Sequence, residues 1–177
     1  LEMDVQMTQD GILVLRHGEN ETGNIRQMSN CDTVLWKEDY QTIKDSCNFG
    51  YNFQDAEGDY PYRDMTNEEW NEAGVYLTTL EELFAEFGKD TLYVIEIKAD
   101  ADAQRNDTAD ALYDLIEQYD LFDEIIVATS FDDISKYIHD QYPSLQLSAS
   151  HDEAQKMIIH SYTLTGVFYN PGNYNSL

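Results

Sequence analysis

Two short stretches of the chain combine acidic side chains with the alternation that is typical of a β-strand. Glu2 and Asp4 stand two residues apart, and Glu96 and Lys98 stand two residues apart at the end of an apolar run. Side chains two residues apart on a strand share one face of the sheet. Three carboxylates on one face repel one another unless a cation lies between them, and oxygen ligands favour Mg²⁺ or Ca²⁺. Glu2, Asp4 and Glu96 are therefore candidate metal ligands.

A β-hairpin is expected to bring His17 to the same place. The turn residues 8–11 (Thr-Gln-Asp-Gly) separate two short apolar runs, and that pattern is typical of a hairpin. If the turn centres on residues 9–10, Glu2 pairs with His17 and Asp4 pairs with Leu15. Glu2, Asp4 and His17 then share one face, because side chains alternate along a strand. The opposite face would be apolar and would contain Met3, Val5, Met7, Ile12 and Val14.

Together these side chains suit chemistry on a phosphate ester. A cation held by the carboxylates would bind an anionic phosphate, and Lys98 would add a second positive charge. Histidine, the residue at position 17, is a side chain that can transfer protons near neutral pH. Each feature also has a plain alternative: a solvated strand face for Glu2 and Asp4, a surface histidine, and a same-face ion pair of Glu96 with Lys98. Their convergence on one face favours the chemical interpretation.

The elements that must hold these residues follow a regular order from residue 66 onward. Thr66-x-x-Glu69 and Thr79-x-x-Glu82 are capping boxes that begin helices, which should end near Gly74 and at Gly88. Apolar periodicity predicts alternating elements after them. The expected strands are 92–97, 125–129, 145–149 and 166–169, and the expected helices are 107–119, 132–142 and 152–162. This alternation implies parallel strands covered by helices.

Residues 18–65, called the insertion below, show little periodicity and are rich in Asn, Asp, Gly and Tyr. A short helix is expected near residues 35–43. An irregular segment this long is uncommon unless it serves a function such as shaping a site. Cys31 and Cys47 both lie in the insertion; we interpret them as two free thiols, with an extracellular disulfide as the alternative.

The net charge of -25 limits the partners of the chain. Such a surface repels nucleic acid and anionic lipid, and an anionic substrate would need a cation in the site. No apolar run approaches the roughly 20 residues of a membrane span. Charge and cysteine content leave an extracellular, a membrane-attached and a cytoplasmic location open, with any membrane attachment depending on segments outside this sequence.

The motifs also resemble those of a known family. The run LEMDVQMTQDGILVLRH resembles the Glu-x-Asp-Val strand, Thr-x-Asp-Gly turn and histidine-ending strand of glycerophosphodiester phosphodiesterases. YVIEIK resembles the Glu-Ile-Lys strand of that family, TTLEELFAEFG its preceding helix, and VATSF a later strand. The resemblance extends over roughly residues 1–150. It implies a (β/α)8 TIM barrel in a single domain, with the insertion following the N-terminal hairpin.

The resemblance also implies a function. Glu2, Asp4 and Glu96 would bind the divalent cation, Ca²⁺ or Mg²⁺, His17 would be a general acid or base, and Lys98 would contact the phosphate. A glycerophosphodiester would be cleaved to an alcohol and glycerol 3-phosphate, a reaction of lipid metabolism.

Two departures from the family pattern shape the alternatives. Gly18 replaces the aspartate that usually follows the histidine, and the family's first strand, ending in His-Arg, and its last strand are not in this sequence. We therefore expect a partial barrel that needs both strands for activity. A degraded barrel that only binds a metal or a phosphodiester is the alternative from another class, and a related enzyme acting on another phosphodiester is the third.

Overall fold

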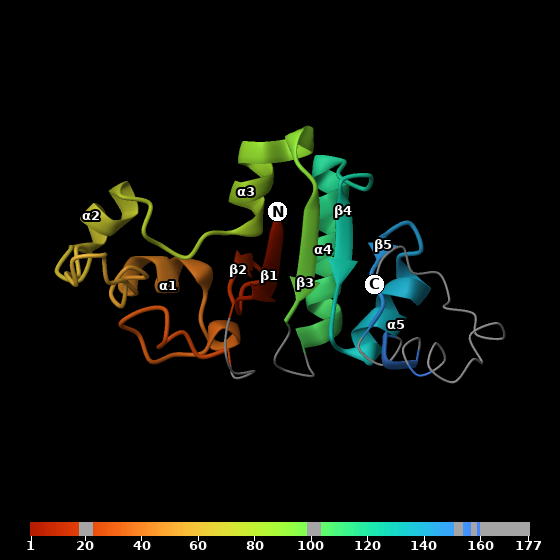
Figure 1. Cartoon of the computed structure of the whole chain (residues 1–177), viewed down its shortest axis with the longest axis horizontal. Helices are drawn as coiled ribbons and strands as arrows, with labels where there is room; N and C mark the ends of the chain where they lie inside the picture. The colour runs from red at the N-terminus through yellow and green to blue at the C-terminus, as the bar shows by residue number, and fades with distance from the viewer. Residues whose placement is uncertain (18–22, 99–103, 151–153, 157–158, 160–177) are drawn as a thin grey trace.

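The chain forms an α/β structure around a five-stranded sheet, as the alternating pattern predicted (Figure 1). This computed structural model describes residues 1–17, 23–98, 104–150, 154–156 and 159. The sheet has the order β2-β1-β3-β4-β5, in which β2 is antiparallel to β1 and the other neighbours are parallel. Its strands are β1 (Glu2–Met7), β2 (Leu13–Leu15), β3 (Tyr93–Ile97), β4 (Ile125–Ala128) and β5 (Gln146–Leu147).

The described strands form an open sheet, so closure into an eight-stranded barrel stays a prediction. The strand expected at 166–169 lies outside the described residues, and so does most of the helix expected at 152–162.

Three helices bury one face of the sheet. They are α3 (Leu80–Phe87), α4 (Arg105–Tyr119) and α5 (Asp132–Gln141), and Figure 1 shows α4 lying along β3 and β4. Alternate strand residues such as Val5, Ile95 and Val127 are fully buried in this cluster. The other face carries Glu2, Asp4 and Glu96, and Val94 on it remains 37% exposed. Strand alternation thus separates a helix-covered apolar face from a face with polar groups.

Local capping signals set the helix boundaries as expected. The hydroxyl of Thr66 accepts from the backbone N–H of Glu69 at the start of α2 (Asn67–Glu72), and Thr79 forms the same box with Glu82 at the start of α3. Gly88, at a φ of 47°, ends α3. Among the described helices, none combines the length and the apolar composition that crossing a bilayer would require.

The predicted hairpin is present, but its predicted register is wrong by one residue. Val5 pairs with Leu15 and Met7 pairs with Leu13. The turn contains three residues because Gly11 adopts a φ of 83°, and the N–H of Thr8 donates to the carbonyl of Ile12 over 3.0 Å. The extra residue moves every side chain of β2 to the opposite face. Leu13 therefore joins the helix-covered cluster, whereas Ile12 and Val14, predicted there, pack in a second cluster.

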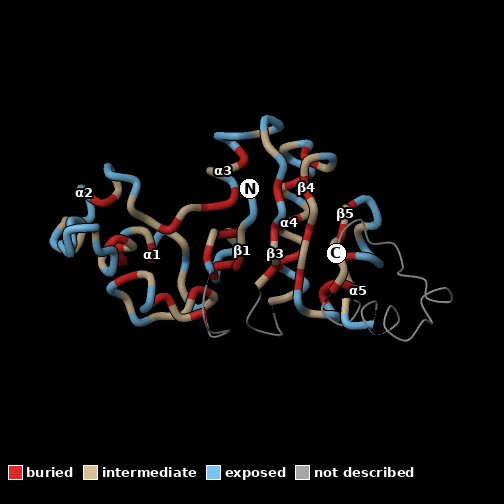
Figure 2. The backbone as a smooth tube through the Cα atoms, viewed as in Figure 1, coloured by how far each residue is buried: buried red, intermediate tan, exposed pale blue. Residues whose placement is uncertain are grey.

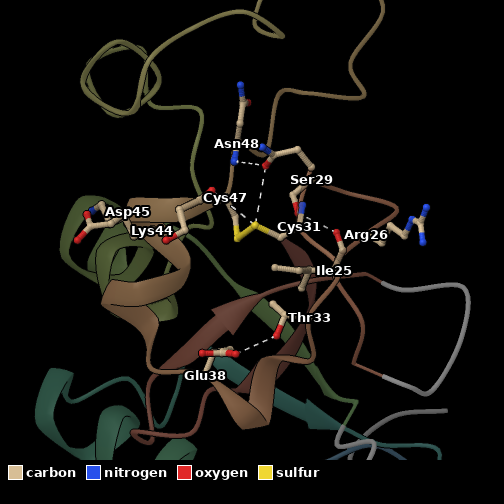
Figure 3. The surroundings of a disulfide bond; sticks show 12 residues. Ile25, Arg26, Ser29, Cys31, Thr33, Glu38, Lys44, Asp45, Cys47 and Asn48 are labelled. Atoms are coloured by element: carbon tan, nitrogen blue, oxygen red, sulfur yellow. Dashed lines mark hydrogen bonds between the residues drawn. A yellow bond between two sulfur atoms is a disulfide. The ribbon is translucent and has the colours of Figure 1, made fainter.

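That second cluster is the core of the insertion region, and a disulfide lies in it. The insertion contains the short 3₁₀ helix η1 (Leu35–Lys37) and α1 (Tyr40–Ser46), in place of one helix near residues 35–43. Cys31 and Cys47 are joined by a disulfide, with Cα atoms 5.5 Å apart (Figure 3). The prediction of two free thiols was wrong because the fold brings the loop at Cys31 against the end of α1. The buried residues of this cluster, the insertion core, are Val14, Ile25, Leu35, Ile43, Cys47 and Leu77.

The chain leaves the sheet after β2 and returns beside the same strand at residues 78–79. The N–H of Leu15 donates to the carbonyl of Thr78 over 2.9 Å, and Val14 forms an antiparallel bridge with Thr79. Figure 1 shows α1 and α2 to the side of the sheet beyond β2. In Figure 2 the buried residues run along the strands, and exposed residues predominate around α2.

Candidate active site

Three carboxylates meet on neighbouring parallel strands. β1 and β3 pair in a register that sets Asp4 opposite Glu96, and Glu2 lies two residues earlier on the same face of β1. One oxygen from each of Glu2, Asp4 and Glu96 lies within 4.8 Å of the others. The structure therefore brings together all three residues that the sequence suggested as ligands.

Asp4 is the most constrained of the three. It is 7% exposed, and its Oδ2 atom is buried without a hydrogen bond. Burial raises the pKa of Asp4; the charge of Lys98 opposes that change and the charge of Glu96 adds to it, with a raised pKa as the net result. A buried carboxylate oxygen that lacks a donor is costly unless a cation faces it. This donor set, all oxygen and all anionic, fits a hard divalent cation.

Lys98 reaches the same cluster from the end of β3. Its Nζ atom lies 2.8 Å from Oε1 of Glu96. Burial lowers the pKa of Lys98, but the hydrogen bond and charge of Glu96 and the charge of Asp4 outweigh it, so the pKa is raised. The lysine stays protonated and offsets only part of the negative charge of three carboxylates.

His17 lies near the cluster, although the strand pairing differs from the predicted one. Its Nε2 atom lies 3.8 Å from Oδ2 of Asp4, and its side chain is 82% exposed. The predicted pairing of Glu2 with His17 is wrong, because β2 ends at Leu15. Beyond Leu15 the N–H of Arg16 still donates to the carbonyl of Asp4 over 3.0 Å, and the imidazole of the next residue lies near the carboxylate of Asp4. The predicted proximity of His17 to Asp4 is thus present, although its reason differs.

Two buried polar residues beside the cluster were not selected from the sequence. Gln6 is 4% exposed and Arg16 is 2% exposed, and Nη1 of Arg16 donates to Oε1 of Gln6 over 2.5 Å. Gln6 continues the alternation of Glu2 and Asp4, so the strand pattern could have identified it. Arg16 bonds to the carbonyl of Asn24 in the insertion, a contact that its neighbours in the sequence do not indicate.

Comparison with known proteins gives one family and a set of structures. The chain matches the model of the glycerophosphoryl diester phosphodiesterase family over residues 1–170. A search of curated proteins returned no match.

The similar solved structures have the same fold at low sequence identity. The glycerophosphoryl diester phosphodiesterase domain of a Mycobacterium tuberculosis protein superposes with a TM-score of 0.67 at 15% identity, covering 91% of this chain and 52% of that one. A glycerophosphoryl diester phosphodiesterase homologue from Silicibacter pomeroyi gives 0.61 at 20% identity, covering 84% and 53%. An Oleispira antarctica phosphodiesterase, solved with the product sn-glycerol-3-phosphate, gives 0.61 at 13% identity, covering 99% and 70%. The chain spans about half the length of the first two structures.

Proposed function

Because this chain belongs to the glycerophosphoryl diester phosphodiesterase family, we propose that it supplies the metal site of a hydrolase acting on glycerophosphodiesters. The products would be an alcohol and glycerol 3-phosphate. The family implies a TIM barrel, in which strands other than the five described here would close the open sheet. Those strands would complete the set of catalytic groups.

The clustering of Glu2, Asp4 and Glu96 is the observation that carries this proposal. Their oxygens approach within 4.8 Å, and Oδ2 of Asp4 is buried without a hydrogen bond. Ordinary surface carboxylates separate in solvent, whereas these are held together by strand pairing. Such an arrangement is costly in the folded protein unless a cation is bound.

Each residue then has a distinct role. Glu2, Asp4 and Glu96 would hold Ca²⁺ or Mg²⁺, which supplies Lewis-acid stabilisation of phosphate charge when it is bound. Lys98 would place its ammonium against a phosphate oxygen from the end of β3. His17, exposed and within 3.8 Å of Asp4, would take a proton from the attacking nucleophile as a general base or give one to the leaving alcohol oxygen as a general acid.

The location of the protein is a separate proposal. The Cys31–Cys47 disulfide supports an oxidising compartment such as the extracellular space, because cytosolic thiols are kept reduced. Titration of free thiols in the unfolded, unreduced protein tests for the disulfide on which this proposal depends. Two reactive thiols per chain would contradict it.

The test of the activity measures glycerol 3-phosphate released from glycerophosphocholine by the protein that carries all strands of the barrel. We expect release that stops with a chelator and returns with added Ca²⁺ or Mg²⁺. Glu2→Gln and Glu96→Gln should each weaken calorimetric binding of the cation and lower turnover. Asp120→Asn is the matched control, because Asp120 pairs with Lys89 at the C-terminal end of α4 and contacts none of the proposed site residues.

The outcomes separate the hypotheses. Turnover that persists in chelator would contradict a metal-dependent reaction. Binding of cation and glycerol 3-phosphate without hydrolysis would indicate a binding module. Hydrolysis of other phosphodiesters in preference to glycerophosphocholine would move the substrate class while keeping the site.

A further inference from the structure

A buried chain of hydrogen bonds connects Lys98 with the insertion. Nε2 of Gln6 donates to the backbone carbonyl of Lys98 over 2.8 Å. Nη1 of Arg16 donates to Oε1 of the same amide over 2.5 Å, and Nη2 of Arg16 donates to the carbonyl of Asn24 over 3.0 Å. The series crosses β1 from the end of β3 to the first described residues of the insertion.

The chemistry of these groups fixes the orientation of the Gln6 amide. A guanidinium has only donors, and a backbone carbonyl has only acceptor positions. Oε1 of Gln6 must therefore face Arg16, and Nε2 must face Lys98. A glutamate at this position could accept from Arg16 but could not donate to the carbonyl of Lys98. A serine or threonine side chain would be too short to reach both groups.

The side-chain amide of Gln6 bonds to the carbonyl of Lys98 at the point where β3 ends. β3 ends at Ile97, while the N–H of Lys98 still donates to the carbonyl of Val5 over 3.0 Å. The carbonyl of Lys98 receives the side chain of Gln6 instead of a strand N–H. Both sides of the Lys98 backbone are therefore held by β1, and the base of the lysine side chain is fixed beside Asp4 and Glu96.

Burial of these groups needs an explanation beyond packing. Gln6 and Arg16 are 4% and 2% exposed, and burying an amide and a guanidinium costs free energy that apolar side chains would avoid. A purely structural contact here could be apolar. A polar pair with one allowed orientation instead specifies the position of the group that it holds.

We propose that Gln6 is a positioning residue that aligns Lys98 with the substrate phosphate, and that Arg16 locks Gln6 in its working orientation. This inference rests on the proposed function, in which Lys98 contacts the phosphate. It adds that the insertion, through the carbonyl of Asn24, helps to hold the phosphate side of the site.

The experiment is a double-mutant cycle between Gln6→Met and Lys98→Ala at saturating Ca²⁺. Methionine retains much of the volume of glutamine and adds no charge. We expect Gln6→Met to lower kcat/KM for glycerophosphocholine by roughly 10- to 100-fold, mainly through KM, because small misplacements of a binding group have effects of this size. In the Lys98→Ala background the same change should have less than about a twofold effect, since no ammonium remains to be aligned.

Further variants separate positioning from folding. Gln6→Met/Arg16→Met replaces both partners by apolar groups and should keep the melting temperature near that of the native protein while kcat/KM stays low. Arg16→Lys retains the charge and should give a smaller loss than Arg16→Met. Gln118→Met is the matched control, because Gln118 lies near the far end of α4 and bonds to Glu81.

A second readout is the calorimetric Kd for sn-glycerol 3-phosphate in the same variants. Equal losses from Gln6→Met in both lysine backgrounds would overturn the positioning role and make Gln6 a packing residue. If the native protein binds the ligand with the expected coupling but does not hydrolyse the substrate, the positioning role holds and the proposed reaction fails. If Lys98→Ala changes neither kcat/KM nor Kd, or the native protein neither hydrolyses nor binds, the positioning role is overturned.

Discussion

The sheet and the insertion are stabilised in different ways. The cluster under α3, α4 and α5 draws buried residues from every strand of the sheet and from all three helices. Among the described residues, the insertion core has six that are buried around two short helical segments, and a disulfide joins the loop at Cys31 to the end of α1. Small apolar cores stabilise poorly by themselves, and covalent links commonly supplement them.

The difference corresponds to what each region contains. The carboxylates need strand pairing to hold them against their mutual repulsion, so they lie in the well-packed region. The insertion has a smaller core, and the link between Cys31 and Cys47 supplements its apolar packing.

The largest expected effect concerns His17, which lies between β2 and the insertion. His17→Ala should lower kcat by about 10²–10⁴-fold with little change in KM, because a general acid or base contributes on this scale. Thermal stability should not change, since the side chain is 82% exposed. His139→Ala, on α5, is the control. A near-normal kcat on glycerophosphocholine would remove His17 from the mechanism.

A matched pair of cavity variants compares the two cores directly. Ile95 and Ile43 are 0% and 1% exposed, so truncation to alanine should cost each site about 2–5 kcal/mol. Ile95→Ala should lower the stability of the whole sheet, measured by urea denaturation. Ile43→Ala should instead raise hydrogen exchange within the insertion while the sheet stays protected. Equal loss of protection everywhere in both variants would show that the regions unfold as one unit.

Removal of the disulfide tests its role as the support of the insertion core. The cysteines are separated by 16 residues, a loop length for which a crosslink stabilises by about 3 kcal/mol. Cys31→Ser/Cys47→Ser should therefore increase proteolysis and hydrogen exchange in the insertion, with slower turnover through loss of its surface. Protection of β3 and β4 should be retained, and its loss would contradict the separation.

The two capping boxes provide a smaller comparison. Thr66→Ala at α2 and Thr79→Ala at α3 remove the same interaction and should each cost about 1 kcal/mol locally. Because α3 packs on the sheet through Leu80 and Phe84, only Thr79→Ala should lower the global melting temperature. A comparable decrease for Thr66→Ala would place α2 within the cooperative unit of the sheet.

The smallest expected effect concerns a side chain that touches both regions. Nζ of Lys44, on α1, lies 3.9 Å from the ring centroid of Tyr76 and 3.7 Å from Glu82 of α3. Lys44→Met should cost about 0.5–1 kcal/mol, the range for a partly exposed cation–π contact. Exchange of α1 amides should rise slightly and kcat should not change. A strong loss of activity would mean that the orientation of α1 controls the site.

Sequence patterns predicted the features that depend on nearby residues. The capping boxes fixed the starts of α2 and α3, and apolar periodicity located β3, α4, β4 and α5 to within a few residues. The carboxylate cluster was predicted for a similar reason, since alternation places Glu2 and Asp4 on one face and parallel pairing brings Glu96 beside them.

The failures share a dependence on contacts that local patterns do not encode. The hairpin register turned on whether Gly11 was part of the turn, and a single residue reversed the faces of β2. The disulfide required Cys31 and Cys47 to meet through the packing of an irregular segment. Arg16 bonds both to Gln6 and to that same segment, so its place beside Gln6 could not be predicted from its neighbours in the sequence.

The backbone hydrogen bond between Leu15 and Thr78, which brings together the two ends of a long segment, has an evolutionary consequence. Chain segments whose two ends are adjacent can be lengthened, shortened or exchanged without altering the path of the strands that flank them. The entropic cost of a longer loop grows only slowly with its length. Descendants of this protein could therefore remodel the segment between Leu15 and Thr78 while the inherited carboxylates on β1 and β3 stay in register.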